Sequence, residues 1–170
     1  MSRAHQIESL FPELRAYARS ISDRLDAAED LVQDAVERAL RHDDRPTELS
    51  DLRPWMFRII RNLRYDELRK FRVRREYLAR EKRLSNNARE LSDPERDILF
   101  RLAFERLPPE KREVLFLVDV IGLKYAEAAE VMGVASGTVM SRLSRARQAL
   151  RDAVDGTTDQ GHAKAEGGAP

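Results

Sequence analysis

The stretch Ala126-Glu127-Ala128-Ala129-Glu130-Val131-Met132-Gly133-Val134-Ala135-Ser136-Gly137-Thr138 decides the fold of the second half of this 170-residue chain. Its first residues favour a short helix over roughly 125–132, which ends at Gly133, and a longer helix follows over about 136–154. The small side chains of Ala128 and Ala129 permit two helices to cross closely. The pattern is typical of a helix-turn-helix, although a corner of this kind can also be a tight connection and nothing more.

The longer helix of this motif has two different faces. At 100° per residue, Val139, Leu143, Ala146 and Leu150 fall on one inward stripe. The outward face and its flanks are polar or basic, and no acidic residue lies between positions 136 and 151. Short polar side chains reach base edges in the major groove, and arginines bind phosphate or guanine. The expected DNA-binding residues are Ser136, Thr138, Met140, Ser141, Arg142, Ser144, Arg145 and Arg147. Arg145 faces outward toward the bases, and Arg142 lies on the phosphate-facing flank.

Helical periodicity extends upstream through nearly the whole chain, and no convincing period-two strand is present. The sequence therefore predicts an all-α protein with two small helical modules, 1–83 and 93–155. Residues 84–92 are polar and predict a flexible linker between them. The tail, 156–170, is rich in Gly, Ala and polar residues and is predicted to be disordered.

Several helix boundaries can be predicted from local signals. Asp26 and Glu29 form a capping-box pattern that would open the second helix. Ser50 or Asp51 is expected to cap a long third helix, with Pro54 in its first turn. The expected buried face of that helix consists of Leu52, Trp55, Met56, Ile59 and Leu63. The sequence Asp93-Pro94-Glu95 predicts the start of the next helix.

Composition excludes several classes of protein. The chain has no cysteine, so disulfide frameworks and thiolate chemistry are excluded. No apolar run approaches the ~20 residues that span a bilayer, and no signal peptide is visible, so we expect a soluble cytoplasmic protein without membrane insertion. The three histidines lie far apart, at an N-terminal segment, a loop and the tail. No catalytic motif or phosphate loop is present, so we expect neither an enzyme nor a cofactor or metal site.

Charge is distributed unevenly, although the net charge is only +1. Residues 23–51 hold ten acidic and four basic residues, a net charge of −6. Residues 58–83 hold eleven basic and four acidic residues, a net charge of +7. This asymmetry is compatible with one surface for a polyanion and another for a basic protein, or with two solvated helices.

Three motifs together resemble bacterial extracytoplasmic-function (ECF) RNA polymerase sigma factors. The first is 107–115 with 122–129 and 137–147, which resembles the family's promoter-reading helix-turn-helix domain. The second, 28–35, is similar to its polymerase-binding helix, and the third, 54–63 with Asp66 and Arg69, to its −10 melting segment. Met140 stands where many members have a basic residue, which leaves an apolar contact, such as one to a thymine methyl, open there. Ala128 replaces a larger aliphatic residue, which should tighten the packing.

The resemblance implies a factor that binds core RNA polymerase, at the β′ clamp helices and the β flap, and directs it to promoter DNA. The first module would bind polymerase and capture the −10 strand, and the second would read the −35 duplex. The implied polymerase-binding residues are Glu29, Asp30, Gln33, Asp34 and Glu37. The implied −10 residues are Arg58, Arg61, Asn62, Arg64, Tyr65, Arg69, Lys70, Phe71 and Arg72, with Arg74 and Arg75 as further phosphate contacts. Phe71 and Tyr65 are the candidates for exposed aromatic side chains that capture a base, whereas Trp55 is assigned to the core.

The resemblance also implies control by an anti-sigma factor, and a role in stress responses. The tail from Gly156 carries only two acidic residues, and no segment of the chain is predicted to cover its own basic surfaces. We therefore expect control from another chain. The alternatives are a sigma-like decoy that binds an anti-sigma factor without reading DNA, and a plain helix-turn-helix repressor. The acidic segment 23–51 would stay unexplained in a repressor.

Overall fold

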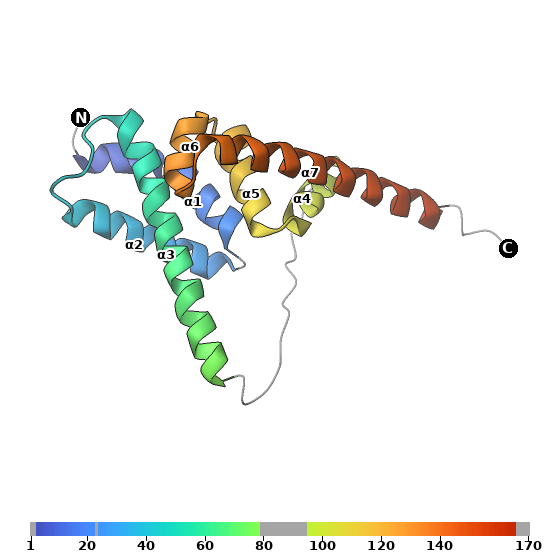
Figure 1. Cartoon of the computed structure of the whole chain (residues 1–170), viewed down its shortest axis with the longest axis horizontal. Helices are drawn as coiled ribbons and strands as arrows, with labels where there is room; N and C mark the ends of the chain where they lie inside the picture. Colours follow the sequence, from blue (N-terminus) through green and yellow to red (C-terminus); the bar gives the residue numbers. More distant parts are fainter. Residues whose placement is uncertain (1–2, 23, 79–94, 166–170) are drawn as a thin grey trace.

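The computed structural model describes residues 3–22, 24–78 and 95–165, with side chains described over 5–22, 24–73 and 100–156. Its described residues form helices and connecting turns, without a strand, as predicted. The elements are α1 (Arg3–Ile21), α2 (Leu25–Arg41), α3 (Leu49–Leu78), α4 (Glu95–Arg106), α5 (Pro109–Leu115), the π-helix η1 (Phe116–Val120), α6 (Tyr125–Met132) and α7 (Ser136–Ala165) (Figure 1). No helix in the described ranges is both long and apolar enough to cross a membrane.

The first module packs α1, α2 and α3 against one another. Leu14 and Tyr17 of α1, Leu31 of α2 and Met56 of α3 are almost completely buried. The predicted buried face of α3 was only partly right, because Trp55 and Ile59 are half-buried whereas Phe57 and Ile60 are fully buried. Packing from two sides explains the difference, since α3 contacts α1 and α2 on one side and α6 on the other.

The second module is built on the predicted helix-turn-helix. α6 ends at Gly133, whose φ of 64° and ψ of 38° place it in the left-handed region that favours glycine. Val139, Leu143 and Ala146 of α7 are buried, and Leu150 is half-buried, which confirms the predicted inward stripe. The helix before this motif was expected to run to Gly122, and its last five residues are instead a π-helix, η1.

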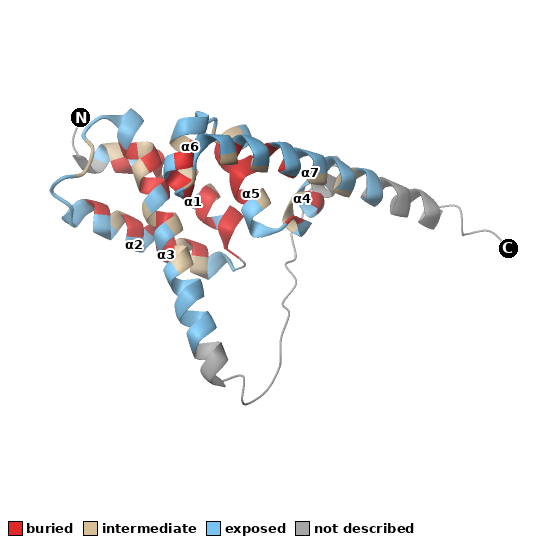
Figure 2. Cartoon of the chain, viewed as in Figure 1, coloured by how far each residue is buried: buried red, intermediate tan, exposed pale blue. Residues whose placement is uncertain are grey.

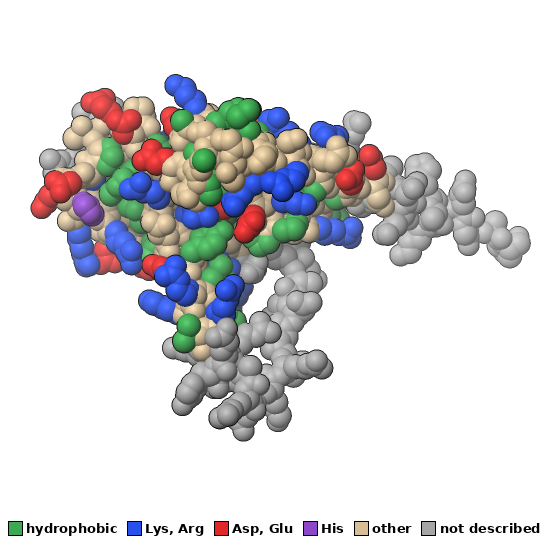
Figure 3. All heavy atoms as spheres, in the orientation of Figure 1, with side chains coloured by type: hydrophobic (Ala, Val, Ile, Leu, Met, Phe, Trp, Pro, Cys, Tyr) green, Lys and Arg blue, Asp and Glu red, His purple; other side chains and the backbone are tan. Residues whose placement is uncertain are grey.

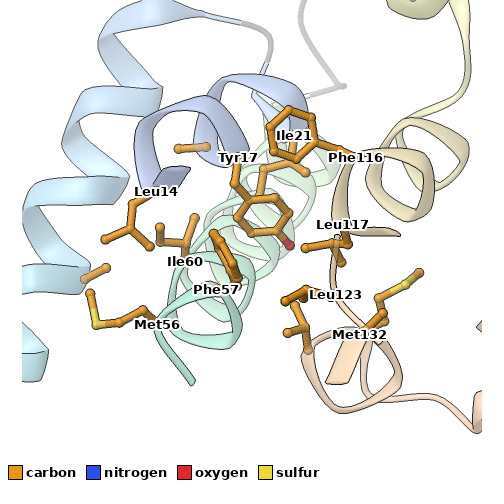
Figure 4. Close-up of a cluster of buried hydrophobic side chains, with 14 of the residues drawn as sticks. Leu14, Tyr17, Ile21, Met56, Phe57, Ile60, Phe116, Leu117, Leu123 and Met132 are labelled. Atoms are coloured by element: carbon orange, nitrogen blue, oxygen red, sulfur yellow. The ribbon is translucent and has the colours of Figure 1, made fainter. Parts of the chain in front are cut away.

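The two modules, which the sequence predicted to be joined by a flexible linker, share one hydrophobic core. The Tyr17 ring packs edge-on against Phe57 of its own module, with centroids 5.1 Å apart, and lies 6.2 Å from Phe116 of the second module. Figure 4 shows these side chains between the ribbons of the two modules, with Leu117, Leu123 and Met132 completing the second module's side. All belong to a single cluster of buried residues. The segment 84–92, predicted as the linker, lies outside the described residues.

Two predicted boundaries were wrong, and a third is not tested. α2 begins at Leu25 without a side-chain cap, so Asp26 lies in its first turn and makes no capping box with Glu29. α3 begins at Leu49, and the Glu48 carbonyl accepts the first helical N–H groups, so neither Ser50 nor Asp51 is the cap and Pro54 lies beyond the first turn. The expected helix start at Pro94 lies outside the described residues.

The C-terminal helix is longer than predicted. α7 continues to Ala165, so the first ten residues of the predicted disordered tail, 156–165, are helical. A helix already anchored by packing gains one hydrogen bond for each added residue, which favours extension even through Gly156. The far ends of α3 and α7 both project from the packed body (Figure 1), and residues 66–73 of α3 are exposed (Figure 2).

Candidate polymerase and nucleic-acid interfaces

The outward face of α7 is presented to solvent by a rigid local frame. The Ala135 carbonyl accepts hydrogen bonds from the N–H groups of Thr138 and Val139, which fixes the start of the helix. At the α6 end of the motif, the Lys124 N–H donates to Glu127 Oε2 at 2.7 Å. The exposed residues predicted to bind DNA are Ser136, Met140, Ser141, Ser144, Arg145 and Arg147, and the half-buried ones are Thr138 and Arg142. These side chains therefore lie on one accessible helical surface.

A polar hollow of about 280 Å³ lies between α5 and α7. Lys111, Arg142 and Arg145 line it together with Glu110, so three cations and one carboxylate meet there. The Arg145 guanidinium also donates to the Ser141 carbonyl at 3.2 Å, which holds it along the helix. Lys111 was missed by the sequence prediction because only the fold brings it beside the recognition helix.

Arg147 differs from the other basic residues of α7. Its guanidinium makes two hydrogen bonds to the Asp119 carboxylate of η1, at 3.0 and 2.6 Å. This hydrogen bonding and the negative charge of Asp119 raise the pKa of Arg147. The structure therefore gives Arg147 an intramolecular partner, which leaves Arg142 and Arg145 as the arginines that face the hollow.

The predicted polymerase-binding residues of α2 fall into two groups. Asp30, Gln33 and Asp34 are exposed and follow helical spacing on one face, and none of them takes part in an ion pair among the described residues. Glu29 is instead bound by Arg15 at 3.1 Å and Arg19 at 3.0 Å.

Glu37 pairs with Arg41 one turn later on the same helix. The acidic side chains left available to a partner on this face of α2 are therefore those of Asp30 and Asp34. Figure 3 shows further acidic side chains at the left edge of the molecule, near the connection from α2 to α3.

The outer part of α3 carries several of the exposed cations of the first module. Asn62, Arg69, Lys70 and Arg72 are exposed, and Figure 3 shows Lys and Arg side chains along this part of the helix. Phe71 is 64% exposed, so it remains an aromatic side chain available for stacking. The side chains of Arg74 and Arg75 lie outside the described residues.

Four other predicted −10 residues are engaged within the protein. Arg64 is largely buried and donates to the Ile21 carbonyl at 3.1 Å, a contact that joins α3 to the end of α1. Arg58 approaches Glu130 of α6 at 3.5 Å. Arg61 and Tyr65 both contact Glu113 of α5. The prediction that Tyr65 is an exposed aromatic is wrong, because the residue is half-buried, with its hydroxyl bound to Glu113 and Arg61 over its ring.

Glu113 is the centre of a buried polar cluster between the modules. Its carboxylate accepts hydrogen bonds from Tyr17 Oη at 2.8 Å, Arg61 Nε at 2.8 Å and Tyr65 Oη at 3.4 Å. The Arg61 guanidinium also lies 4.3 Å from the Tyr65 ring centroid. Glu113 is 1% exposed, and a buried carboxylate is tolerated only when paired and hydrogen-bonded, as here. Burial raises the pKa of Tyr17 well above its usual value, and the Glu113 charge raises it further.

Two further contacts join the modules at the edge of this cluster. Arg53 of α3 pairs with Glu13 at 2.6 Å and also donates to the Ile121 carbonyl at 2.7 Å. The other contact is the pair that Arg58 of α3 makes with Glu130 of α6. We call the state in which Glu113, Arg53 and Arg58 hold the two modules together the closed arrangement. The expectation that no segment of the chain covers its own basic surfaces is therefore wrong for Arg61, whereas Arg58 stays exposed.

Comparison with known proteins assigns both modules. The family model described as Sigma-70 region 2 matches residues 6–75, and the one described as Sigma-70, region 4 matches residues 97–150. The ECF RNA polymerase sigma factor EcfG of Rhodopseudomonas palustris (strain TIE-1) is 40% identical over 157 residues, which cover 88% of this chain and 84% of that protein. The chain belongs to the ECF sigma factor family. ECF sigma factor SigC of Mycobacterium tuberculosis (strain CDC 1551 / Oshkosh) is 34% identical over 126 residues, 73% of this chain and 68% of SigC.

Two solved structures have the same fold. The sigma factor RpoE in complex with the anti-sigma factor NepR from Bartonella quintana aligns with a TM-score of 0.76 and 33% identity, over 89% of this chain and 96% of that one. CnrH in complex with the cytosolic domain of CnrY aligns with a TM-score of 0.60 and 27% identity, over 90% and 87% of the two chains. In this sigma factor, region 2 is thus formed by α1–α3 and region 4 by α4–α7.

Proposed function

We propose that this ECF sigma factor recruits core RNA polymerase to promoters through three separate surfaces. Asp30, Gln33 and Asp34 of α2 bind the β′ clamp helices, the outer part of α3 binds the −10 strand, and α7 reads the −35 duplex. The observation that carries the proposal is the face of α7, which is exposed, free of acidic residues and anchored by a buried stripe on its opposite side. A helix presented in this way fits the major groove.

The −10 contact is divided between charge and stacking. Arg69, Lys70 and Arg72 supply cations for the phosphates of an opened strand, and the exposed Phe71 supplies a surface on which a base can stack. The polymerase carries out RNA synthesis. The sigma factor acts in the cytoplasm, where it binds the polymerase and orients the promoter DNA.

An anti-sigma factor is the proposed regulator. The similar sigma factor RpoE is bound to the anti-sigma factor NepR, and CnrH is bound to the cytosolic domain of CnrY. A partner that contacts both regions of this chain would block the α2 surface and the DNA-binding surfaces at once. A small protein that competes with core polymerase should therefore be recovered with the chain from its native cells.

In vitro transcription tests the proposal. The purified chain is added to core polymerase on sheared genomic DNA from the same organism, and run-off transcripts are mapped. Discrete transcripts that are absent with core polymerase alone support the proposal. A decoy would yield none, and a repressor would bind duplex DNA without binding core polymerase. Either result would overturn the proposal.

A further inference from the structure

The polar cluster around Glu113 joins groups with different expected roles. Arg61 and Tyr65 belong to the α3 segment proposed to bind the −10 strand, whereas Glu113 belongs to the module proposed to read the −35 element. Arg61 keeps only 17% of its side chain exposed in this arrangement. The Glu113 carboxylate of region 4 therefore forms an ion pair with Arg61, a cation that region 2 is proposed to use for binding DNA.

From this geometry we infer that Glu113 competes with single-stranded DNA for Arg61 and Tyr65. A carboxylate and a DNA phosphate are both anionic oxygen acceptors for a guanidinium group. Tyr65 is held by region 4 as well, because its hydroxyl donates to Glu113 at 3.4 Å in the closed arrangement. When region 4 moves away, this contact is lost and the Tyr65 side chain becomes available to a base. The inference rests on the proposed function and adds regulation within the chain to the same −10 site.

The two regions are not covered equally. The DNA-facing side chains of α7, including Met140, Ser144 and Arg145, remain exposed in the closed arrangement. Phe71 and the neighbouring cations Arg69, Lys70 and Arg72 on α3 are exposed as well. The masking is therefore local, because it removes Arg61 and Tyr65 from the −10 site while the −35 surface stays accessible. The closed molecule should bind −35 duplex DNA and bind single strands only weakly.

The equilibrium between closed and open forms depends on the charge of Glu113. In the closed arrangement Arg61 has this buried carboxylate as its counter-charge. Without that charge, desolvation of Arg61 opposes closure and the open form gains population. The apparent affinity for a ligand that binds only the open form rises in proportion to that population.

The test uses the full chain and a fluorescein-labelled single-stranded DNA of mixed sequence, about 20 nucleotides long. Glu113→Gln should raise affinity in fluorescence anisotropy by about fivefold or more relative to the unmodified chain. Glu130→Gln is the matched control, because it removes the same charge from another contact between the modules, at an exposed position. It should change affinity by less than about twofold, as expected for the loss of one exposed, screened charge.

The dependence on Arg61 is tested by a double variant. In an Arg61→Gln background, Glu113→Gln should give no further gain in affinity, because the masked cation is already absent. Equal gains from Glu113→Gln and Glu130→Gln, or a gain that persists without Arg61, would overturn the inference. Glu113→Ala is a second variant that removes the carboxylate, and it should raise affinity as Glu113→Gln does. Circular dichroism of each protein checks that the helices remain folded.

A distance measurement separates masking from other effects. The chain has no cysteine, so Arg38→Cys and Asp152→Cys place one dye on each module without background labelling. Glu113→Gln should lower the energy transfer between the dyes, and Glu130→Gln should not. If transfer falls while affinity for the single strand is unchanged, masking is wrong and the proposed function stands. If the unmodified chain and core polymerase together yield no transcripts, the proposed function is wrong instead.

Discussion

Arg142 and Arg145 lie on the same hollow but at different depths, which predicts different roles. Arg145 is exposed and held along α7 by Ser141, so it is placed to reach a base edge. Its replacement by alanine should relax the sequence preference at particular −35 positions, with a loss of about 1–3 kcal/mol against the preferred base. Selection of bound sequences from a randomised duplex library measures this preference.

Arg142 is half-buried beside Lys111 and is expected to bind phosphate. Alanine at Arg142 or at Lys111 should weaken binding to all sequences alike and lower the dependence of log K on log salt by about one. Binding isotherms at several salt concentrations check both variants. Identical specificity profiles for the Arg142 and Arg145 variants would contradict this division of roles.

Tyr17 should make stability sensitive to alkaline pH. Its pKa is raised in the folded protein by burial and by Glu113, whereas in the unfolded chain it titrates near 10. Above pH ~10 the unfolded state therefore binds fewer protons than the native state. The free energy of unfolding should then fall by up to about 1.4 kcal/mol per pH unit, and the contribution should be intact below that range.

Tyr17→Phe should remove this alkaline contribution. It should also lower stability near neutral pH by about 1.5–3 kcal/mol, because Glu113 loses a hydrogen bond to a charged group. Urea unfolding between pH 7 and 11 measures both effects. Tyr125→Phe is the control, since Tyr125 is 40% exposed, and it should keep the alkaline slope. An unchanged slope in Tyr17→Phe would mean that another group is responsible.

At the scale of the helix, α2 is predicted to bind core polymerase through only some of its acidic residues. Asp30 and Asp34 are exposed and without an intramolecular ion pair among the described residues, whereas Glu29 is already held by two arginines. Asp30→Arg with Asp34→Arg should weaken core binding by about tenfold or more, because charge pairs at interfaces contribute strongly.

The matched control is Glu29→Gln, which removes one negative charge from the same helix. It should weaken core binding much less than the double reversal, and mainly through its lost contacts to α1. Surface plasmon resonance on immobilised core polymerase gives both affinities. Binding of the −35 duplex should be unaffected in either protein, and equal losses of core binding would argue against the assignment of the Asp30–Asp34 face.

The helices themselves were largely predictable from the sequence, because their periodicity and the turn at Gly133 are local signals. The inward stripe of α7 followed from spacing alone. The helix starts at Leu25 and Leu49 did not, because neither uses the side-chain cap that the local sequence offers. The positions of Phe57 and Glu113 also could not be predicted, since their surroundings are created by contact between modules distant in sequence.

At the scale of the whole molecule, the shared core predicts cooperative unfolding. Buried residues of both modules form one cluster, so the free protein should show a single calorimetric transition with equal calorimetric and van't Hoff enthalpies. In Glu113→Gln, opening should uncouple the modules and divide the transition into two. Scanning calorimetry measures this, and two transitions in the unmodified chain would show that the modules are energetically independent.

The contacts that close the molecule differ in how they tolerate divergence of the sequence. Arg53 donates to the backbone carbonyl of Ile121, an acceptor that every amino acid supplies. Position 121 can therefore drift among related proteins without loss of this contact. Position 113 has no such freedom, because three donors converge on one side-chain carboxylate. In an alignment of homologues, position 113 should therefore vary together with positions 17, 61 and 65, while position 121 varies independently of position 53.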